Sequence, residues 1–206
     1  MTGLIDYGVG NLFSLKSSLA AIGEEAAVTS DLRVLREADR IILPGVGAFA
    51  DAMEKLKDAG LDNGVRELAL SKPLLGICLG MQLLFDESFE FGRHRGLGLI
   101  PGKVVPIESA PGFVQGYKIP HIGWNSLTFD ENCPLFAGLR QGEHVYFVHS
   151  YYADCPGKYV SAVTEYGASL TAAVRRNNIF GCQFHPEKSG AAGLSILKAF
   201  CGINGA

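Results

Sequence analysis

Cys78 is the residue whose surroundings most clearly favour chemistry. It lies between Gly76 and Gly80, where the apolar run Leu74–Ile77 gives way to a helical pattern. A nucleophile with glycines two residues before and after it, between a strand and a helix, is typical of a nucleophile elbow, whose sharp turn projects the side chain in a strained conformation. The start of a helix would also favour the thiolate, through backbone N–H groups and the helix dipole. The alternative is a buried core cysteine beside a glycine-rich turn.

His185 is the candidate proton carrier for such a thiolate, because it follows directly on an apolar run. In the sequence Phe-His-Pro-Glu, Glu187 comes two residues later and could hold the imidazole of His185 in the required tautomer. Pro186 restricts the backbone between the two residues, which suits a rigid pair. Alone, such a tetrapeptide is more often part of an ordinary loop. Together with the cysteine elbow it indicates a Cys-His-Glu triad.

A third motif, Pro44-Gly45-Val46-Gly47, follows the apolar run 41–43. Acyl transfer needs backbone N–H groups where the oxyanion forms. We expect one donor from Leu79, the residue after the nucleophile, and a second from the glycine-rich motif. A turn before a helix is the alternative interpretation of that motif. Gln82 lies one helical turn after Cys78, where it could bind a polar substrate or lie at the surface.

The other motifs do not lead to a nucleotide or metal site. The segment 6–11 is rich in glycine, but Phe13 fills the position of the third glycine of a dinucleotide-binding loop, and no P-loop occurs. We expect the four other cysteines, Cys133, Cys155, Cys182 and Cys201, to be structural or incidental. No metal-ligand spacing connects the cysteines with the remaining histidines, His94, His121, His144 and His149. We therefore expect neither a metal nor an organic cofactor.

Composition places the chain among ordinary globular proteins. Its 206 residues, 48% of them hydrophobic and 19% charged, can build a sizeable core. A net charge of −3 without a basic cluster argues against nucleic-acid binding. No apolar run approaches the roughly 20 residues of a membrane span. The first basic residue is Lys16, which argues against a secretory signal, and five cysteines without a C-x-x-C pair fit a reducing compartment. We expect a soluble cytoplasmic protein that binds no nucleic acid and no membrane.

Short apolar runs alternate with helical periodicities, which predicts an α/β fold. We expect a single domain, residues 1–206, with a mostly parallel central sheet flanked by helices and an additional antiparallel strand region. The expected strands are 4–5, 41–43, 74–77, 145–148, 159–163, 170–174 and 179–184, with short irregular strands between 96 and 132. The expected helices are 12–22, 48–70 with breaks at Gly60 and Gly64, 79–85 and 191–200.

The three motifs together resemble those of the class I, or triad, glutamine amidotransferases. The blocks that carry this resemblance are Gly-Ile-Cys-Leu-Gly-Met-Gln, Pro-Gly-Val-Gly and Phe-His-Pro-Glu. Members of this family are α/β proteins whose Cys-His-Glu triad hydrolyses glutamine to glutamate and ammonia. The resemblance implies that Cys78 is the nucleophile, His185 the acid and base, and Glu187 the partner of His185.

The same resemblance implies the rest of the site. It places oxyanion donors at Leu79 and Gly47, with a peptide flip in 44–47 as the activating switch. Glycines on both sides of Val46 make such a flip physically plausible. Glutamine binding is implied at Gln82, Glu90, Ser150 and Tyr151.

Further blocks narrow the resemblance within this family. They are Asp-Tyr-Gly-Val-Gly-Asn-Leu from residue 6, His-Ile-Gly-Trp-Asn from residue 121, the segment 145–151, and Phe-His-Pro-Glu-Lys-Ser from residue 184. These blocks are similar to those of glutaminase subunits that supply ammonia to a (β/α)-barrel cyclase subunit in histidine biosynthesis. The resemblance implies a heterodimer in which ammonia passes through the barrel to a bound ribonucleotide. The implied partner contacts are Asn11, Trp124, Tyr146 and Lys188.

Three other hypotheses compete with this one. The first is a glutaminase of another pathway, such as pyridoxal phosphate synthesis; the blocks around Trp124 and Lys188 argue against it. The second is a Cys-His peptidase or esterase of similar fold, which would ignore glutamine. The third is a binding subunit without catalysis. The presence of all three triad residue types argues against this last hypothesis.

Overall fold

Eight strands form the central sheet, in the order β2-β1-β3-β4-β14-β13-β12-β9. The computed structural model describes residues 1–204. Neighbours from β2 to β14 run parallel and the remaining pairs are antiparallel, which confirms the expected mostly parallel sheet with an antiparallel region. The strands are β1 (Thr2–Ile5), β2 (Ala26–Thr29), β3 (Arg40–Leu43), β4 (Leu74–Ile77), β9 (Thr128–Phe129), β12 (Val160–Glu165), β13 (Ser169–Arg176) and β14 (Ile179–Cys182).

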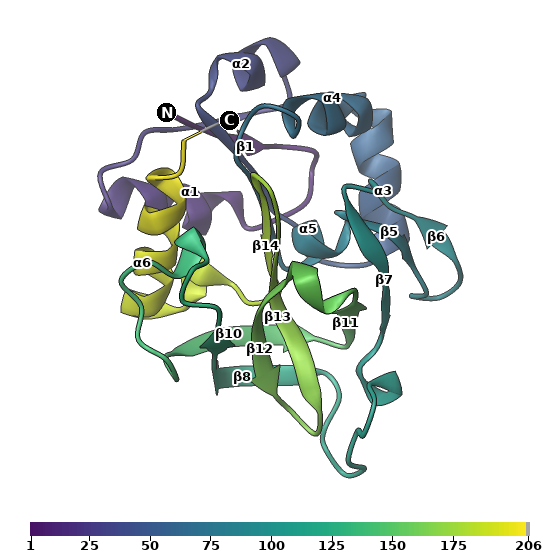
Figure 1. Cartoon of the computed structure of the whole chain (residues 1–206). Coiled ribbons are helices and arrows are strands. Elements are labelled where there is room, and N and C mark those ends of the chain that lie inside the picture. Colours follow the sequence, from purple (N-terminus) through teal and green to yellow (C-terminus); the bar gives the residue numbers. More distant parts are fainter. Residues whose placement is uncertain (205–206) are drawn as a thin grey trace.

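Helices cover both faces of this sheet (Figure 1). Successive residues of a buried strand point to opposite faces. Ile41 and Leu43 therefore pack in one hydrophobic cluster with α3 and α4, whereas Ile42 packs in another with α1 and α6. No helix within residues 1–204 has the length and hydrophobicity that crossing a membrane would require. The helices are α1 (Leu12–Ala21), α2 (Leu32–Glu37), α3 (Phe49–Asp58), α4 (Leu61–Leu68), α5 (Leu79–Gln82) and α6 (Gly190–Cys201).

Two smaller sheets and four short 3-10 helices complete the fold. β10 and β11 follow each other in the chain, yet β10 pairs with β8 and β11 with β7, so Ser150 lies at the junction of two sheets. The strands of these sheets are β5 (Phe85–Ser88), β6 (His94–Arg95), β7 (Ile100–Pro106), β8 (His121–Ser126), β10 (His144–His149) and β11 (Tyr151–Asp154). The 3-10 helices are η1 (Ile107–Ser109), η2 (Pro134–Phe136), η3 (Gly157–Tyr159) and η4 (Pro186–Lys188).

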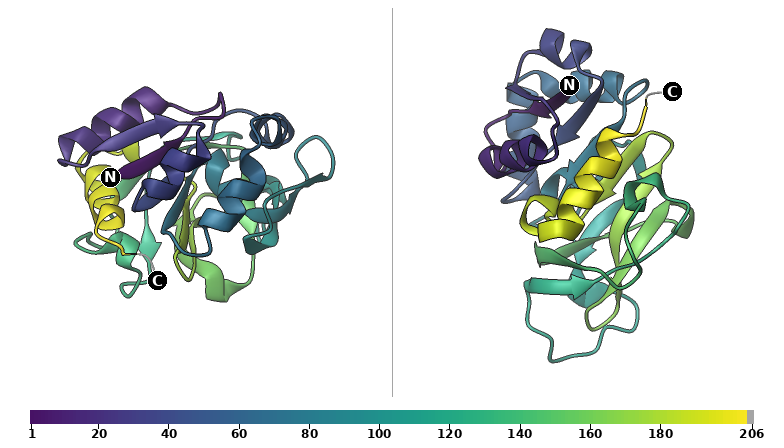
Figure 2. Two further views of the ribbon diagram at one scale, coloured as in Figure 1. Left: turned by 90° about the horizontal axis from the view of Figure 1, so that it is seen from above. Right: turned by 90° about the vertical axis from the view of Figure 1, so that its left-hand side faces the viewer.

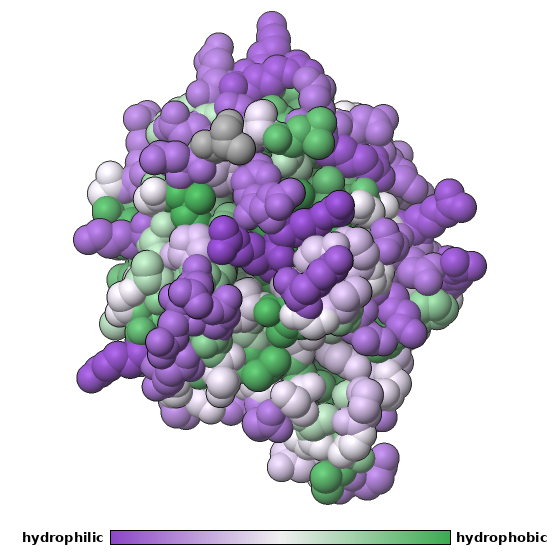
Figure 3. Space-filling view, viewed as in Figure 1, coloured by the Kyte–Doolittle hydropathy of each residue, from purple (hydrophilic) through white to green (hydrophobic). Residues whose placement is uncertain are grey.

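A loop between η1 and β8 projects from the body of the molecule, away from the helices (Figure 2). The surface is largely hydrophilic, but hydrophobic atoms appear at the tip of this loop (Figure 3). Val114 and Tyr117, both exposed, belong to it. A main-chain hydrogen bond ties the middle of the loop to the turn between β12 and β13, since the Val114 N–H donates to the Gly167 carbonyl at 2.8 Å.

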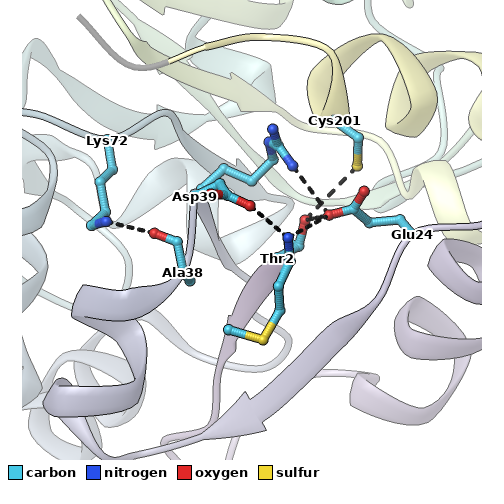
Figure 4. Close-up of polar contacts among 8 residues, drawn as sticks. Thr2, Glu24, Ala38, Asp39, Lys72 and Cys201 are labelled. Atoms are coloured by element: carbon cyan, nitrogen blue, oxygen red, sulfur yellow. Dashed lines mark hydrogen bonds and ion pairs between the residues drawn. The ribbon is translucent and has the colours of Figure 1, made fainter.

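Polar contacts tie together the N-terminal ends of the parallel strands (Figure 4). Glu24 accepts hydrogen bonds from Thr2 Oγ1 at 2.7 Å and from Arg40 Nη1 at 3.1 Å. The amino group of Met1 lies 2.6 Å from Asp39 Oδ2. This end of the sheet is therefore closed by its own side chains, and the opposite, C-terminal end carries the residues that the sequence singles out.

Two helix predictions need correction. Gly60, with φ 68°, separates α3 from α4 as predicted, but Gly64 lies inside α4. A Cβ at Gly64 would come within 2.3 Å of the Leu32 side chain, so this glycine serves close packing against α2 rather than a helix break. The helix that was expected to reach Phe85 ends at Gln82, because Phe85 begins β5 and pairs with β7.

Candidate active site

The candidate residues converge where three neighbouring parallel strands end. β3, β4 and β14 are adjacent, and their C-terminal ends lead into 44–47, Cys78 and His185 respectively. Ligands of open α/β sheets bind at this edge. A cavity of about 310 Å³ lies there. It is lined by Val46, Gly47, Cys78, Leu79, Gln82, Glu90, Pro120, Val148, His149, Ser150, Tyr151 and His185.

Cys78 has the strained backbone that the elbow pattern predicts, with φ 54° and ψ −113°. The sharp turn is thus made by the cysteine itself, and the flanking glycines have another role. A Cβ on Gly76 would lie 2.6 Å from the Gly80 carbonyl oxygen, and one on Gly80 only 1.9 Å from the Leu43 carbonyl oxygen. The glycines let α5 approach β3 and β4 closely, which fixes where the thiol projects.

His185 and Glu187 form a buried pair beside the thiol. Nδ1 of His185 lies 2.8 Å from Oε1 of Glu187, and each side chain is 3% exposed. Because a carboxylate accepts, Nδ1 carries a hydrogen and Nε2 is left to face Cys78. Burial would lower the pKa of His185, but hydrogen bonds and charges from Cys78 and Glu187 raise it to about 9. At neutral pH the imidazole is therefore protonated beside the sulfur.

The two glycines of the glycine-rich motif have different surroundings, one open and one closely packed. Gly47 has φ 94°, and a Cβ there would meet nothing within 4 Å. Gly45, by contrast, packs against α5, since its Cβ would lie 2.5 Å from the Gly80 nitrogen. Leu79 is the first residue of α5, so its N–H has no partner within the helix. Both residues assigned as oxyanion donors, Gly47 and Leu79, line the cavity.

All four residues assigned to glutamine binding line the cavity, but two have groups already occupied. The Gln82 amide nitrogen donates to the Tyr151 carbonyl at 3.1 Å and to Gln183 Oε1 at 2.9 Å. Only its carbonyl oxygen remains for a ligand. One oxygen of Glu90 accepts the N–H of Phe49 at 2.6 Å, at the start of α3, and holds the carboxylate in place.

Two residues near the nucleophile escaped the sequence analysis. Gln183 is fully buried and its amide nitrogen lies 3.7 Å from Cys78 Sγ. Tyr7 is buried, and its hydroxyl donates to the Pro44 carbonyl at 2.7 Å, at the start of the glycine-rich motif. Burial raises the pKa of Tyr7, so it remains a donor. Gln183 had a signal, because it is the one polar residue of the apolar run 179–184.

Comparison with known proteins identifies the family. The model of the glutamine amidotransferase class-I family matches residues 3–202. The chain belongs to this family. A curated relative from Caldanaerobacter subterraneus subsp. tengcongensis is 48% identical over 97% of this chain and 97% of its own length. One from Carboxydothermus hydrogenoformans is 52% identical over 96% and 97%. Both are named imidazole glycerol phosphate synthase subunit HisH.

The fold of this class-I amidotransferase is also that of solved structures. A crystal structure of a glutamine amidotransferase superimposes with a TM-score of 0.73, covering 97% of this chain and 98% of the other, at 21% identity. At that identity the likeness concerns the fold alone. It agrees with the sheet and flanking helices described above.

The other cysteines of this amidotransferase have surroundings unlike those of Cys78. Burial raises the pKa of each of their thiols: Cys133, Cys155, Cys182 and Cys201. Cys78 alone faces an imidazole among the described residues. Within residues 1–204, no three His, Cys, Asp or Glu side chains come together in an arrangement that could hold a metal ion.

Three of the four residues expected at a partner interface form one cluster. Trp124 on β8 is 55% exposed, and its ring lies 6.1 Å from that of Tyr146. Lys188 Nζ lies 5.7 Å from the Tyr146 ring. Asn11 instead caps the N-terminus of α1, where its Oδ1 accepts the Ser14 N–H at 3.3 Å. The cluster adjoins η4, which also carries Glu187.

Proposed function

We propose that this amidotransferase hydrolyses glutamine to glutamate and ammonia, with Cys78, His185 and Glu187 as its catalytic triad. The observation that carries the proposal is that a cysteine with a strained backbone meets a histidine paired with a carboxylate at the ends of β4 and β14. A thiolate next to an imidazolium suits attack on a carboxamide, whose poor leaving group needs a proton. The proposal includes a role as the glutaminase subunit of an imidazole glycerol phosphate synthase.

In the first half of the reaction, the Cys78 thiolate attacks the side-chain carbonyl carbon of glutamine. The carbonyl oxygen becomes an oxyanion that accepts hydrogen bonds from the N–H groups of Leu79 and Gly47. His185 then donates the proton on Nε2 to the nitrogen, the carbon–nitrogen bond breaks, and ammonia leaves a thioester on Cys78.

In the second half, the now neutral His185 accepts a proton from water as the water attacks the thioester. The second tetrahedral intermediate collapses, glutamate leaves, and the thiolate–imidazolium pair is restored. Glu187 stabilises the imidazolium and holds Nδ1–H throughout, so that Nε2 always faces the reacting atoms.

The remaining lining residues of the cavity recognise the substrate. The Glu90 carboxylate is suited to the α-ammonium group of glutamine, and Ser150 and Tyr151 offer polar groups at the junction of β10 and β11. Gln82 contributes its free carbonyl oxygen. Gly47 can change its backbone orientation without a side-chain clash, and we assign the activating peptide flip to the peptide bond between Val46 and Gly47.

The second subunit is a (β/α)-barrel cyclase, and the cluster of Trp124, Tyr146 and Lys188 faces it. Asn11 is a fourth contact with this partner and lies outside the cluster, at the start of α1. Support comes from the relatives' names and from the exposed tryptophan, since aromatic anchors are typical of interface centres. Ammonia passes through the barrel to a ribonucleotide, which yields imidazole glycerol phosphate and the aminoimidazole carboxamide ribonucleotide. We place the complex in the cytoplasm.

Glutamate formation from glutamine tests the proposal, measured with the chain alone and with the cyclase subunit plus its nucleotide ligand. We expect strong stimulation in the complex and loss of activity in Cys78→Ala. Cys155→Ala, which removes a thiol outside the cavity, is the control and should keep activity. No glutamate under either condition, or hydrolysis of peptides or esters in its place, would contradict the proposed function.

A further inference from the structure

Two buried histidines beside the cavity take no part in the mechanism above. His121 and His149 are opposite each other in the register of β8 and β10 and are 2% and 6% exposed. Nδ1 of His121 lies 3.0 Å from Nε2 of His149. The His121 ring is also stacked between the rings of Phe147 at 4.8 Å and Tyr166 at 3.9 Å. Two imidazoles in direct contact share one hydrogen, so the tautomer of one ring dictates that of the other.

The surrounding groups decide where the hydrogens lie. Nδ1 of His149 is 2.9 Å from the Tyr151 carbonyl oxygen, which can only accept, so this ring carries its hydrogen on Nδ1. Nε2 of His149 then accepts, and His121 must donate from Nδ1. At the far end, the Asn125 amide nitrogen lies 3.5 Å from Nε2 of His121 and also donates to the Glu165 carbonyl at 2.9 Å. The hydrogen bonds from Asn125 through His121 and His149 thus form a series in which each donor points toward the Tyr151 carbonyl.

Both rings are neutral under this arrangement. Burial lowers the pKa of His121 to about 4. Burial also lowers the pKa of His149, to about 3, although its hydrogen bond to the Tyr151 carbonyl acts in the opposite direction. The neighbouring imidazoles of His121 and His185 disfavour a positive charge on His149 as well. A neutral ring has one donor and one acceptor, which matches the directed chain of hydrogen bonds.

The Tyr151 carbonyl is the point where this series of hydrogen bonds meets the active site. The same oxygen accepts a second hydrogen bond from the amide of Gln82 at 3.1 Å. Gln82 is bonded in turn to Gln183, whose amide contacts Cys78 Sγ. Both lone pairs of the carbonyl are occupied, one from the side of the nucleophile and one by His149. The position of this main-chain segment relative to the thiol therefore depends on both donors.

We propose that His149, kept in its Nδ1–H tautomer by His121, is a positioning residue for glutamine binding. It anchors the main chain of Tyr151 and, with it, the wall of the cavity formed by Ser150 and Tyr151. The inference rests on the proposed function, because that wall is assigned to glutamine. His149 acts through Tyr151 and transfers no proton, so its loss weakens the binding of glutamine and leaves the nucleophile reactive.

Substitutions of His149 separate the donor from the ring. His149→Asn keeps an amide donor close to the position of Nδ1, whereas His149→Phe keeps the ring and removes the donor. In the complex with the cyclase subunit, His149→Phe should raise the KM for glutamine about three- to tenfold, the effect of one buried hydrogen bond. His149→Asn should restore the KM toward wild type. In both variants kcat and the rate of Cys78 alkylation by iodoacetamide should stay at their wild-type values. His144→Asn, an exposed residue on the same strand, is the control.

Nitrogen NMR of the wild-type full chain, labelled with nitrogen-15 histidine, tests the arrangement without substrate. Two of the five histidines should give the signals of neutral Nδ1–H tautomers at neutral pH. One of these signals should be missing from the spectrum of His121→Gln and the other from that of His149→Asn. A charged ring or an Nε2–H tautomer at either position would overturn the proposal, as would an unchanged KM in a folded His149→Phe. Absence of glutamate formation in wild type would remove the proposed function and the substrate role together, whereas the tautomers would still report the hydrogen-bond chain.

Discussion

Ser189 donates its hydroxyl hydrogen to the carbonyl oxygen of His185 across 2.6 Å. The Ser189 hydroxyl oxygen in turn accepts the N–H of Tyr146 at 2.9 Å. The N–H of His185 donates to the Tyr146 carbonyl at 2.9 Å. Ser189 is 2% exposed, so water cannot replace these bonds. One hydroxyl thus joins the proposed base to β10, the strand that carries a proposed partner contact.

Ser189→Ala should destabilise the fold and lower glutaminase activity. The substitution leaves the Tyr146 N–H without a partner, which costs about 1–3 kcal/mol of unfolding free energy. The His185 carbonyl loses one of its two donors and keeps the N–H of Lys188 at 3.0 Å. Urea denaturation measures this loss, and steady-state kinetics of the complex measure the effect on kcat. Ser109→Ala is the matched control, because Ser109 also donates to a carbonyl at 2.6 Å but is exposed. Equal losses in the two variants would contradict the role of burial.

Glu187→Gln should lower kcat by about 10²-fold or more without abolishing activity. His185 keeps its place but loses the carboxylate that orients its ring and stabilises its protonated form. The carboxylate stabilises the imidazolium, so its removal lowers the pKa of His185 from about 9. The alkaline limb of the kcat/KM profile, where the imidazolium loses its proton, should therefore move to lower pH. An unmoved limb, or full activity in Glu187→Ala, would show that Glu187 does not support His185.

Gly80→Ala should prevent the close approach of α5 to β3. A Cβ at this position would lie 1.9 Å from the Leu43 carbonyl oxygen, and backbone cannot yield as a flexible side chain can. We expect a loss of about 3 kcal/mol or more in unfolding free energy. Gly157→Ala, where a Cβ meets nothing within 4 Å and φ is not positive, should be tolerated. A wild-type melting temperature for Gly80→Ala would contradict the packing role.

Trp124→Ala should weaken binding of the cyclase subunit by about 30-fold or more, the effect expected of an aromatic anchor at an interface. The side chain is exposed in the isolated chain, so stability should change little. Titration calorimetry with the purified cyclase subunit measures the change. Leu70→Ala removes an exposed hydrophobic residue that precedes β4, at the other end of the sheet, and should bind like wild type. Equal affinity for all three proteins would place the interface elsewhere.

The hydrophobic pattern of the sequence is sufficient to predict the strands that are buried on both faces. Runs such as 41–43 and 74–77 are continuously apolar, as parallel strands between two helical layers must be. β2 and α2 were missed, because Ala26–Thr29 at the sheet edge is only half-buried and α2 spans a mere six residues. β11 was missed because it continues directly from β10, and only its pairing with β7 distinguishes the two strands.

The sequence alone determined the types and order of the reactive groups, since Gly-x-Cys-x-Gly and His-x-Glu are local patterns with local physical meaning. Tertiary structure decided what those groups can do. Strand order brings Cys78 next to His185, and close packing explains why Gly80 is a glycine. The roles of Gln183, Tyr7 and the His121–His149 pair depend on contacts between residues far apart in the chain. Hydrogen bonding and burial, which set each tautomer and charge, exist only once those strands have paired.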